Sequence, residues 1–498
     1  MHHFIFPSQD TWISSGSSTI DGESFKDQNF GRDQILEVKK EFFNNSFDHQ
    51  TRALVNFNGT EFTELSKSVS DGTIASDAKY FLRLYEAEGN SEMTEEYKLA
   101  IQPISQSWVE GTGKFGDRPK NTNGCSWENR SNPIGGTEVK WNPKSIGNEK
   151  ASGSLNIIGN FGQDEGDELQ ITVGGTEFRF VASDPSAIPV DDSPIFFHST
   201  GSSAATYLNS LVTQINAASI GVTAVDGSSF LSLTASDAGI NGNNISVDTG
   251  SGTTFSDVLT LEGGTDTVTS ADGDGPSVLL VSQSVQSFAN QSPDVEVEVT
   301  NMVNMWLQGQ VENYGMLIRF SGSQETDSET FGHLKFFSRN THTIYSPQLE
   351  VRWDDHLPCT GSNTGSLNQL VVSGLADNFI YMKGLRESYK VGERVKFRVE
   401  SRKRYIQKTF TTSVQNVTGS FIPEGSGSYA IKDVATDEFI VPFSDFTKLS
   451  CDSDSNYFIQ YLDGFYPDRV YKIQLKLKYD DGQEQVFDDD FEFIVKRK

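Results

Sequence analysis

The sequence contains little cysteine, and the spacing of its cysteines excludes the usual structural uses of that residue. The 498-residue chain has three, Cys125, Cys359 and Cys451, and no two of them form a CxxC pair. Zinc sites and disulfide-stapled folds need more cysteines at closer spacing. We therefore expect three ordinary thiols, with neither a zinc site nor a disulfide framework.

Long apolar runs are absent as well. No run approaches the roughly 20 apolar residues that a membrane-spanning helix needs. Residues 1–7, MHHFIFP, lack the basic start and the long apolar core of a secretory signal. We expect a soluble chain that is made in the cytosol and has no membrane span.

Positive charge is scarce. The chain has 40 Lys and Arg residues against 68 Asp and Glu residues, so its formal net charge is −28. Nonspecific binding to nucleic acid or to anionic lipid depends on positive surface. The composition therefore argues against nucleic acid as a partner.

One basic cluster stands out in this acidic chain. Arg402, Lys403 and Arg404 follow the alternating basic residues of 394–398, and Lys408 comes shortly after. This cluster predicts docking of an acidic partner, with residues 488–490 (DDD) as an intramolecular choice. The alternative is a row of basic residues on the solvent-exposed face of a strand.

Motifs for catalysis are missing too. No GxSxG, Walker, dinucleotide-binding or HExxH motif occurs in a usable context. In so acidic a chain, carboxylate pairs say little about glycoside hydrolysis. We therefore expect a protein that is not an enzyme, and we name no catalytic residue, cofactor or metal ligand. We expect solvated loop positions for the histidines, which are His2, His3, His49, His198, His333, His342 and His356.

Short apolar stretches separated by polar turns are what the sequence has in abundance. Alternation such as that of residues 34–38 (QILEV) predicts antiparallel sheets with one buried face. The length suggests about three domains. Seven such strands in residues 358–498 suit an immunoglobulin-like sandwich. They are predicted at 379–382, 394–399, 430–433, 439–443, 457–461, 470–479 and 491–495.

Residues 151–271 differ from their surroundings. They contain no Lys, one Arg and 14 acidic residues, a net charge of −13 that marks a domain boundary. A hairpin is predicted around Gly174 and Gly175, and a helix over 204–218 with Leu208 and Leu211 on its apolar side. Further strands are predicted at 222–225, 230–235 and 245–247.

Two acidic loops in and beside this segment raise the question of calcium. They are residues 163–168 and 271–275, and neither follows the spacing of a known calcium loop. We expect solvated charge there, and no bound metal.

Four tryptophans are the candidate contact residues for a glycan or a partner. Trp108 lies in SWVEGTG (107–113) and Trp306 in MWLQG (305–309), each after a predicted strand, 97–104 or 295–303. Trp127 and Trp141 lie in residues 114–143, which are rich in Gly, Asn and Pro. Aromatic rings beside amides suit a sugar-binding face, and the alternative is that the rings plug one end of a sandwich.

The order of several motifs resembles a known family. RALVNF (52–57), KYFLRLY (79–85), SWVEG (107–111), NYGMLI (313–318) and PQLEVRW (347–353) occur in the order found in the DNRLRE family. That family consists of jelly-roll sandwiches similar to carbohydrate-binding modules. The resemblance implies a discontinuous jelly-roll sandwich of residues 1–150 plus 272–357, closed by an edge strand at 347–353.

A second resemblance concerns the interrupting segment. LTASDAGINGNNI (233–245) followed by LEGGTD (261–266) is similar to a small α+β module recurrent in phage tail sheath and tail-fibre proteins. The resemblance implies that residues 151–271 form such a module, inserted in the first sandwich, and that the protein belongs to a tailed-phage particle.

These observations lead to one leading hypothesis of function and two others. The leading hypothesis is a non-enzymatic virion structural protein of a tailed phage, assembled in the host cytoplasm, which decorates or connects the tail, baseplate or neck. Its partners would be other virion proteins and further copies of itself in a symmetric particle. The alternative is an adhesion module that binds glycan on the host surface. A third hypothesis is a polysaccharide depolymerase.

Overall fold

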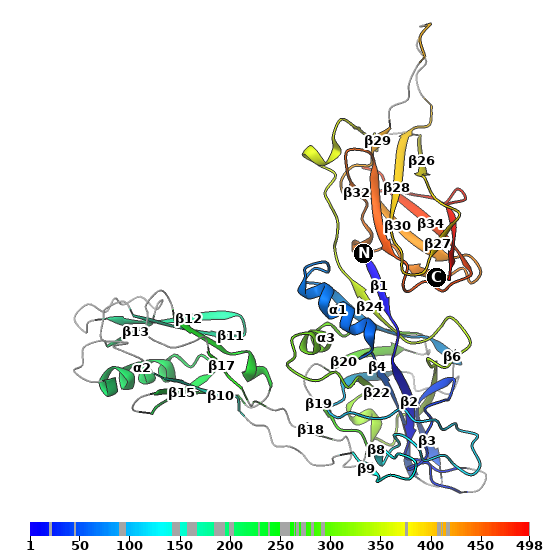
Figure 1. Cartoon of the computed structure of the whole chain (residues 1–498). Helices are drawn as coiled ribbons and strands as arrows, with labels where there is room; N and C mark the ends of the chain where they lie inside the picture. The colour runs from blue at the N-terminus through cyan, green and yellow to red at the C-terminus, as the bar shows by residue number, and fades with distance from the viewer. Residues whose placement is uncertain are drawn as a thin grey trace.

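In the computed structural model β-strand is the main secondary structure, and helices are few. The described residues are 1–18, 22–43, 46–88, 96–141, 150–156, 167–183, 195–198, 204–227, 230–237, 240–249, 259–262, 264, 268–269, 275–279, 283–289, 294–373, 377–405, 410, 412–414 and 419–497. Within these ranges three α-helices occur, α1 (Thr60–Ser70), α2 (Ala204–Ala218) and α3 (Thr300–Leu307). The predicted mainly β, multi-domain fold class is confirmed (Figure 1).

Two antiparallel sheets form what we call the first sandwich. The smaller sheet has the order β1 (His2–Ile5), β24 (Gln348–Arg352), β5 (Lys79–Leu84) and β21 (Val295–Glu298). The larger sheet has the order β20 (Ser284–Ala289), β7 (Glu96–Pro103), β22 (Met316–Phe320), β4 (Ser46–Asn56), β3 (Ile35–Phe43), β23 (Gly332–Phe337) and β6 (Glu86–Glu88), and β2 (Gln9–Ser14) also pairs with β4.

Alternate residues of both sheets meet in one hydrophobic core. Leu82 and Val351 from the smaller sheet and Val55 and Phe336 from the larger sheet are fully buried in the same cluster. Each strand hides every second side chain because successive side chains of a strand point to opposite faces. The cluster joins residues that precede and follow the segment 151–271 in the sequence.

Two of the predictions for this sandwich are wrong. The strand predicted at 295–303 ends at Glu298, and α3 begins at Thr300. Met302, Val303 and Trp306 then lie buried on one side of a helix, the spacing that a helix needs to cover a core. The predicted edge strand at 347–353 is interior, since β24 pairs with both β1 and β5.

A third layer covers the outer face of the larger sheet. Ile13, Leu54 and Leu317 point away from the main core and pack with Trp108, Trp127 and Trp141. Residues 105–141 provide this layer and contain the short pair β8 (Asn129–Ser131) and β9 (Val139–Lys140). The larger sheet is therefore buried on both faces in this region.

The segment that interrupts the first sandwich forms two sheets and a helix, which we call the inserted module. One sheet has the order β10 (Ser152–Asn156), β15 (Phe230–Ala235) and β14 (Val222–Asp226). The other has the order β13 (Ile195–His198), β12 (Thr176–Ser183), β11 (Glu168–Val173), β16 (Ser246–Thr249) and β17 (Leu259–Thr260). The predicted helix, hairpin and strands are confirmed. A short pair, β18 (Val268–Thr269) and β19 (Val278–Leu279), lies where the chain leaves the module.

The last part of the chain forms two further sheets, which we call the C-terminal sandwich. One has the order β25 (Asn368–Gln369), β29 (Ser420–Phe421), β28 (Arg394–Lys403), β33 (Asn456–Tyr461) and β32 (Ser450–Cys451), with β26 (Asn378–Lys383) on β28. The other has the order β27 (Ser388–Lys390), β36 (Glu492–Lys496), β34 (Arg469–Lys478), β30 (Gly427–Asp433) and β31 (Phe439–Val441), with β35 (Glu484–Phe487) on β34. All seven predicted strands are confirmed.

Candidate functional site

The four candidate tryptophans are buried. Trp108, Trp127, Trp141 and Trp306 expose between 3% and 6% of their surface. The indole N–H of Trp108 donates to the carbonyl of Tyr314 at 2.8 Å, and that of Trp141 donates to the carbonyl of Ser126 at 2.8 Å. This burial contradicts the predicted glycan contact through the four rings. Trp127 and Trp141 are core residues, as the alternative predicted, but they cover the outer face of the larger sheet and not one end of the sandwich. Trp306 lies in the main core of the first sandwich.

Trp127 covers a buried ion-pair network. The guanidinium of Arg52 lies 4.3 Å from the Trp127 ring centre, and its Nε donates to Glu325 at 2.6 Å. Arg319 pairs with the other oxygen of Glu325. A fully buried arginine is tolerated because a carboxylate and a ring face replace its hydration. The third layer is therefore held by charge as well as by apolar contact.

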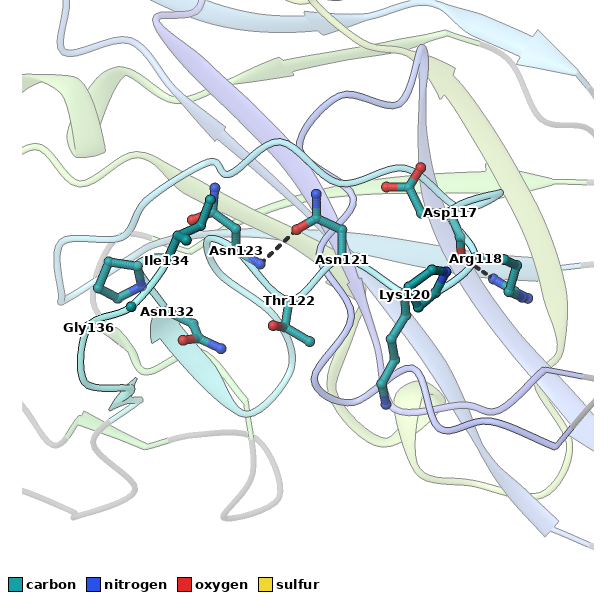
Figure 2. Close-up of a pocket in the computed structure, with 12 residues that line it drawn as sticks. Asp117, Arg118, Lys120, Asn121, Thr122, Asn123, Asn132, Ile134 and Gly136 are labelled. Carbon is teal, nitrogen blue, oxygen red and sulfur yellow. Dashed lines mark hydrogen bonds between the residues drawn. The ribbon is translucent and has the colours of Figure 1, made fainter.

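The surface of the third layer carries amides. A depression of about 680 Å³ is lined by residues 117–123 and 132–136, including Asn121, Asn123 and Asn132. Figure 2 shows these residues on two neighbouring loop segments, with the backbone N–H of Asn123 donating to Asn121 Oδ1 at 2.9 Å. The tryptophans, which mark this region in the sequence, are buried, whereas the polar side chains are exposed to solvent.

The basic cluster lies at the C-terminal end of β28, a strand that buries every second side chain. Arg402 stacks on the ring of Phe379 at 4.7 Å, and Arg404 pairs with Asp377 at 3.0 Å. Lys403 is exposed. The ion pairs found here go to Asp377, and Lys408 lies outside the described residues. The alternative, a row of basic residues on the solvent-exposed face of a strand, describes β28. Lys396 and Arg398 lie on that face and pair with Asp452.

Large exposed apolar side chains follow this basic cluster in the sequence. Tyr405 is 78% exposed, Val414 is 89% exposed, and Phe410 is fully exposed. We call Arg402, Lys403, Tyr405, Phe410 and Val414 the tip. In Figure 1 strand β29, which follows the tip in the sequence, lies at the end of the C-terminal sandwich far from β1. The basic part of the tip was predicted from the sequence, whereas the apolar part was not.

At the opposite end, strand β1 joins the two sandwiches; we call this region the joint. β1 pairs with β24 in the first sandwich, yet the side chain of Phe4 packs in the core of the C-terminal sandwich. A Cβ at Gly464 would lie 2.5 Å from the Cβ of Phe4, so this close approach requires glycine. The Nε2 of Gln460 donates to the carbonyl of His2 at 2.8 Å.

A buried histidine and a buried carboxylate lie at the centre of the joint. His2 Nδ1 lies 2.5 Å from Glu350 Oε1, and His2 Nε2 lies 3.3 Å from the hydroxyl of Ser444 in the C-terminal sandwich. Burial lowers the pKa of His2, so the ring is neutral at pH 7 and donates from Nδ1. Arg352 and Arg83 supply the positive charges beside Glu350.

The prediction of solvated loops for the histidines is wrong for most of them. His2, His3, His49, His198 and His333 lie in strands. His2 is fully buried. His356 pairs with Glu424 at 2.7 Å beside the joint. Sequence spacing could not reveal these places, because each depends on a partner far away in the chain.

A second buried carboxyl lies beneath the third layer. Asp10 accepts a hydrogen bond from the backbone N–H of Arg339 at 2.6 Å, and its own N–H donates to Glu110 at 3.1 Å. Burial, with a smaller contribution from the nearby Glu110 carboxylate, raises the pKa of Asp10 to about 8. Glu110 is in turn paired with Arg339 at 2.8 Å.

The cysteines and the acidic loops are the places in the sequence that raise the question of metal binding. Within the described ranges, no three His, Cys, Asp or Glu side chains are grouped closely enough to hold a metal ion. The three thiols are free and buried. Of the two acidic loops, only Asp167, Glu168 and Gly275 are described; Glu168 pairs with Arg179.

Comparison with known proteins adds no family. No family model matches the chain, and no curated protein matches it. None of the helices in the described ranges has the length and apolarity needed to cross a bilayer.

Proposed function

We propose that this protein is a non-enzymatic structural component of a tailed-phage virion that connects or decorates the tail, baseplate or neck. The similarity of residues 233–245 and 261–266 to a module of phage tail proteins supports the assignment to a tailed-phage particle. The construction of the joint and the exposure of the tip support a role in holding other proteins at fixed positions.

The joint is the observation that carries the proposal. One strand contributes hydrogen bonds to the first sandwich and an aromatic side chain to the core of the C-terminal sandwich. In return, Ile459 and Tyr461 of the C-terminal sandwich pack against the core of the first sandwich. Domains in one chain move relative to each other unless their interface is apolar and extensive. Packing of side chains from each sandwich in the core of the other favours a fixed arrangement of the two, which suits a spacer between neighbouring parts.

The tip is the proposed docking surface of this unit. Exposed aromatic side chains beside basic residues are enriched in protein interfaces, because they combine a large apolar contact with charge recognition. The partner would be an acidic virion protein or a further copy of this acidic chain. The position of the tip, far from the joint, would place that partner at the free end of the unit.

Co-purification with particles tests the assignment. Phage particles from a lysate of the host that encodes this chain would be banded on a density gradient, washed with salt and analysed by mass spectrometry. We expect the chain in the particle band at a constant ratio to capsid and tail proteins. A chain that remains in the soluble fractions would contradict a virion role.

A matched pair of variants tests the tip in the same particles. Replacing Tyr405, Phe410 and Val414 by Ser should lower incorporation at least tenfold, because the apolar contact is removed. Val486→Ser removes an exposed apolar side chain elsewhere on the C-terminal sandwich, where Val486 is 46% exposed, and should leave incorporation unchanged. Equal incorporation of both variants would rule out the tip as the docking surface.

The amide-lined depression favours a second candidate function, binding of a host-surface glycan. Amide side chains recognise sugar hydroxyls, and about 680 Å³ accommodates one or two sugar rings. A pull-down of the full chain with host polysaccharide should retain the protein, and Asn132→Ala should weaken retention. Asn301→Ala, on the exposed side of α3, is the control. Absence of retention on any host polysaccharide would leave the assembly role alone.

A further inference from the structure

Two cysteines that are far apart in the sequence lie side by side in the structure. Cys359 follows the first sandwich in the connecting segment, and Cys451 lies in β32 of the C-terminal sandwich. The amide Nδ2 of Asn456 lies 3.2 Å from the Sγ of Cys359 and 3.7 Å from the Sγ of Cys451. One side-chain amide therefore bridges both sulfur atoms.

The backbone on both sides holds the two thiols in place. The N–H of Cys451 donates to the carbonyl of Leu357 at 3.2 Å, and the N–H of Leu357 donates to the hydroxyl of Ser450 at 3.1 Å. The N–H of Cys359 donates to Glu424 Oε2 at 2.7 Å. The connecting segment thus runs beside β32 and brings Cys359 to its partner without any covalent bond.

The environment also makes the two thiols chemically different. A hydrogen bond from Cys359 lowers the pKa of Cys451, whereas the same contact and burial raise the pKa of Cys359. Cys451 is therefore the better nucleophile of the pair, since the thiolate is the reactive form. Cys125 lies in a different cluster within the third layer, where burial raises its pKa and no second cysteine is present.

We propose that Cys359 and Cys451 form an intramolecular disulfide when the protein meets an oxidising medium, and that this bond locks the connecting segment to the C-terminal sandwich. A low-molecular-weight disulfide is the oxidant. The Cys451 thiolate attacks one of its sulfur atoms and releases one thiol. Cys359 then attacks Cys451 Sγ and releases the second thiol. Two protein thiols are oxidised and one small disulfide is reduced to two thiols, so electrons and protons balance.

The lock would act on the region where it matters most for the shape of the protein. The segment between β24 and β32 follows the joint, and a covalent bond there restricts the unfolded chain over a long loop. A chain made in a reducing cytosol would carry the thiols, and release into an oxidising medium would close the bond. The chemistry itself does not depend on the proposed virion role.

Mass spectrometry of the full chain tests the proposal. The reduced protein would be equilibrated with oxidised glutathione, treated with N-ethylmaleimide in denaturant, and digested. We expect a peptide carrying Cys359 linked to a peptide carrying Cys451, and maleimide on Cys125 alone. The control Cys125→Ser should form the same bond, whereas Cys359→Ser should retain glutathione on Cys451.

A refolding arm keeps the test decisive if burial slows the reaction. The chain would be unfolded in urea, which exposes every thiol, and refolded in an oxidised glutathione buffer. The locked protein should unfold at a higher urea concentration than the reduced protein, and dithiothreitol or Cys359→Ser should remove that shift. Three maleimide-reactive thiols after both treatments, or bonds that include Cys125 at equal yield, would overturn the proposal.

Discussion

The joint and the third layer each bury one carboxyl almost completely, and the pKa values of the two carboxyls are shifted in opposite directions. Glu350 is 0% exposed and Asp10 is 1% exposed. Burial alone would raise the pKa of Glu350, but hydrogen bonds from His2 and Arg352 and the charge of Arg83 lower it to about 2. Burial raises the pKa of Asp10 to about 8, because one backbone N–H and the more distant Arg339 do not compensate for it.

Buried charge therefore has opposite effects on the stability of the two regions. At neutral pH the joint contains an ionised carboxylate surrounded by donors, and losing that anion removes the buried partner of Arg83 and Arg352. The third layer contains a carboxyl that is mostly protonated and faces a second carboxylate. The joint is therefore stabilised by its charge, whereas the third layer is stable in spite of its acidic group.

Removing the anion of the joint should have the largest effect. Glu350→Gln keeps the size of the side chain but leaves Arg352 and Arg83 without their buried partner. We expect a loss of about 3–5 kcal/mol in the free energy of unfolding at pH 7, measured by urea titration of the full chain. Glu296→Gln, which removes the 46% exposed partner of Arg352, should cost less than about 1 kcal/mol. Similar losses in the two variants would contradict the comparison.

The pH dependence of the same variant gives the sign of the effect. The ordinary pKa of Glu350 is 4.5, and its pKa in the folded protein is about 2. Its contribution to stability is therefore complete above pH 4.5 and is lost as the pH falls from 4.5 towards 2. The difference in stability between the natural chain and Glu350→Gln should shrink through that window. A constant difference would show that Glu350 acts through packing alone.

Neutralising the carboxyl of the third layer should have a smaller effect of opposite sign. The folded protein binds the proton of Asp10 up to about pH 8, whereas the unfolded chain loses it near pH 3.8. Stability therefore falls as the pH rises from 3.8 to 8, and Asp10→Asn removes this loss. At about 1.4 kcal/mol per pKa unit, the shift of Asp10 corresponds to about 6 kcal/mol of destabilisation above pH 8. Burying the polar amide of Asn offsets part of that gain. We therefore expect Asp10→Asn to gain a net of about 2 kcal/mol or more at pH 9 and nothing at pH 3.5, measured by urea titration at both values.

Asp27→Asn is the matched control for that experiment. Asp27 lies in the same part of the sandwich, is 37% exposed and pairs with Lys120 at 2.6 Å. Its replacement should change stability by less than about 1 kcal/mol, with no gain at alkaline pH. A lower stability of Asp10→Asn at pH 9 would contradict this. It would mean that losing a carboxylate oxygen as a hydrogen-bond acceptor costs more than removing the buried charge gains.

The strands and α2 could be predicted from the sequence because their patterns are local. Strand β34 (Arg469–Lys478) alternates along its whole length, and α2 repeats its apolar residues at helical spacing. Helix α3 escaped prediction because the alternation of β21 runs into it, and only the burial of Met302, Val303 and Trp306 distinguishes the two. Helix α1 escaped because it buries only Phe62 and Leu65.

The sites were harder to predict because they depend on distant segments. Residues 114–143 contain almost no aliphatic side chain, which favoured exposed tryptophans, but Ile13, Leu54 and Leu317 supply the missing apolar contacts. The joint depends on His2 meeting Glu350, and the thiol pair depends on Cys359 meeting Cys451. Neither pairing follows from the spacing of residues in the sequence. Only the basic part of the tip is a local feature, so only that part could be predicted.

The smallest effect on stability should come from the tip, and this result would complete the contrast with the joint. Replacing Tyr405, Phe410 and Val414 by Ser should change the free energy of unfolding by no more than about 0.5 kcal/mol, because these exposed side chains lose little contact. Phe4→Ala at the joint removes one buried ring and should cost about 3–5 kcal/mol in the same urea titration. A large loss for the tip variant would show that its apolar residues pack within the protein. A stable tip variant that no longer enters particles would instead separate docking from folding, because the same three residues would then matter only when a partner is present.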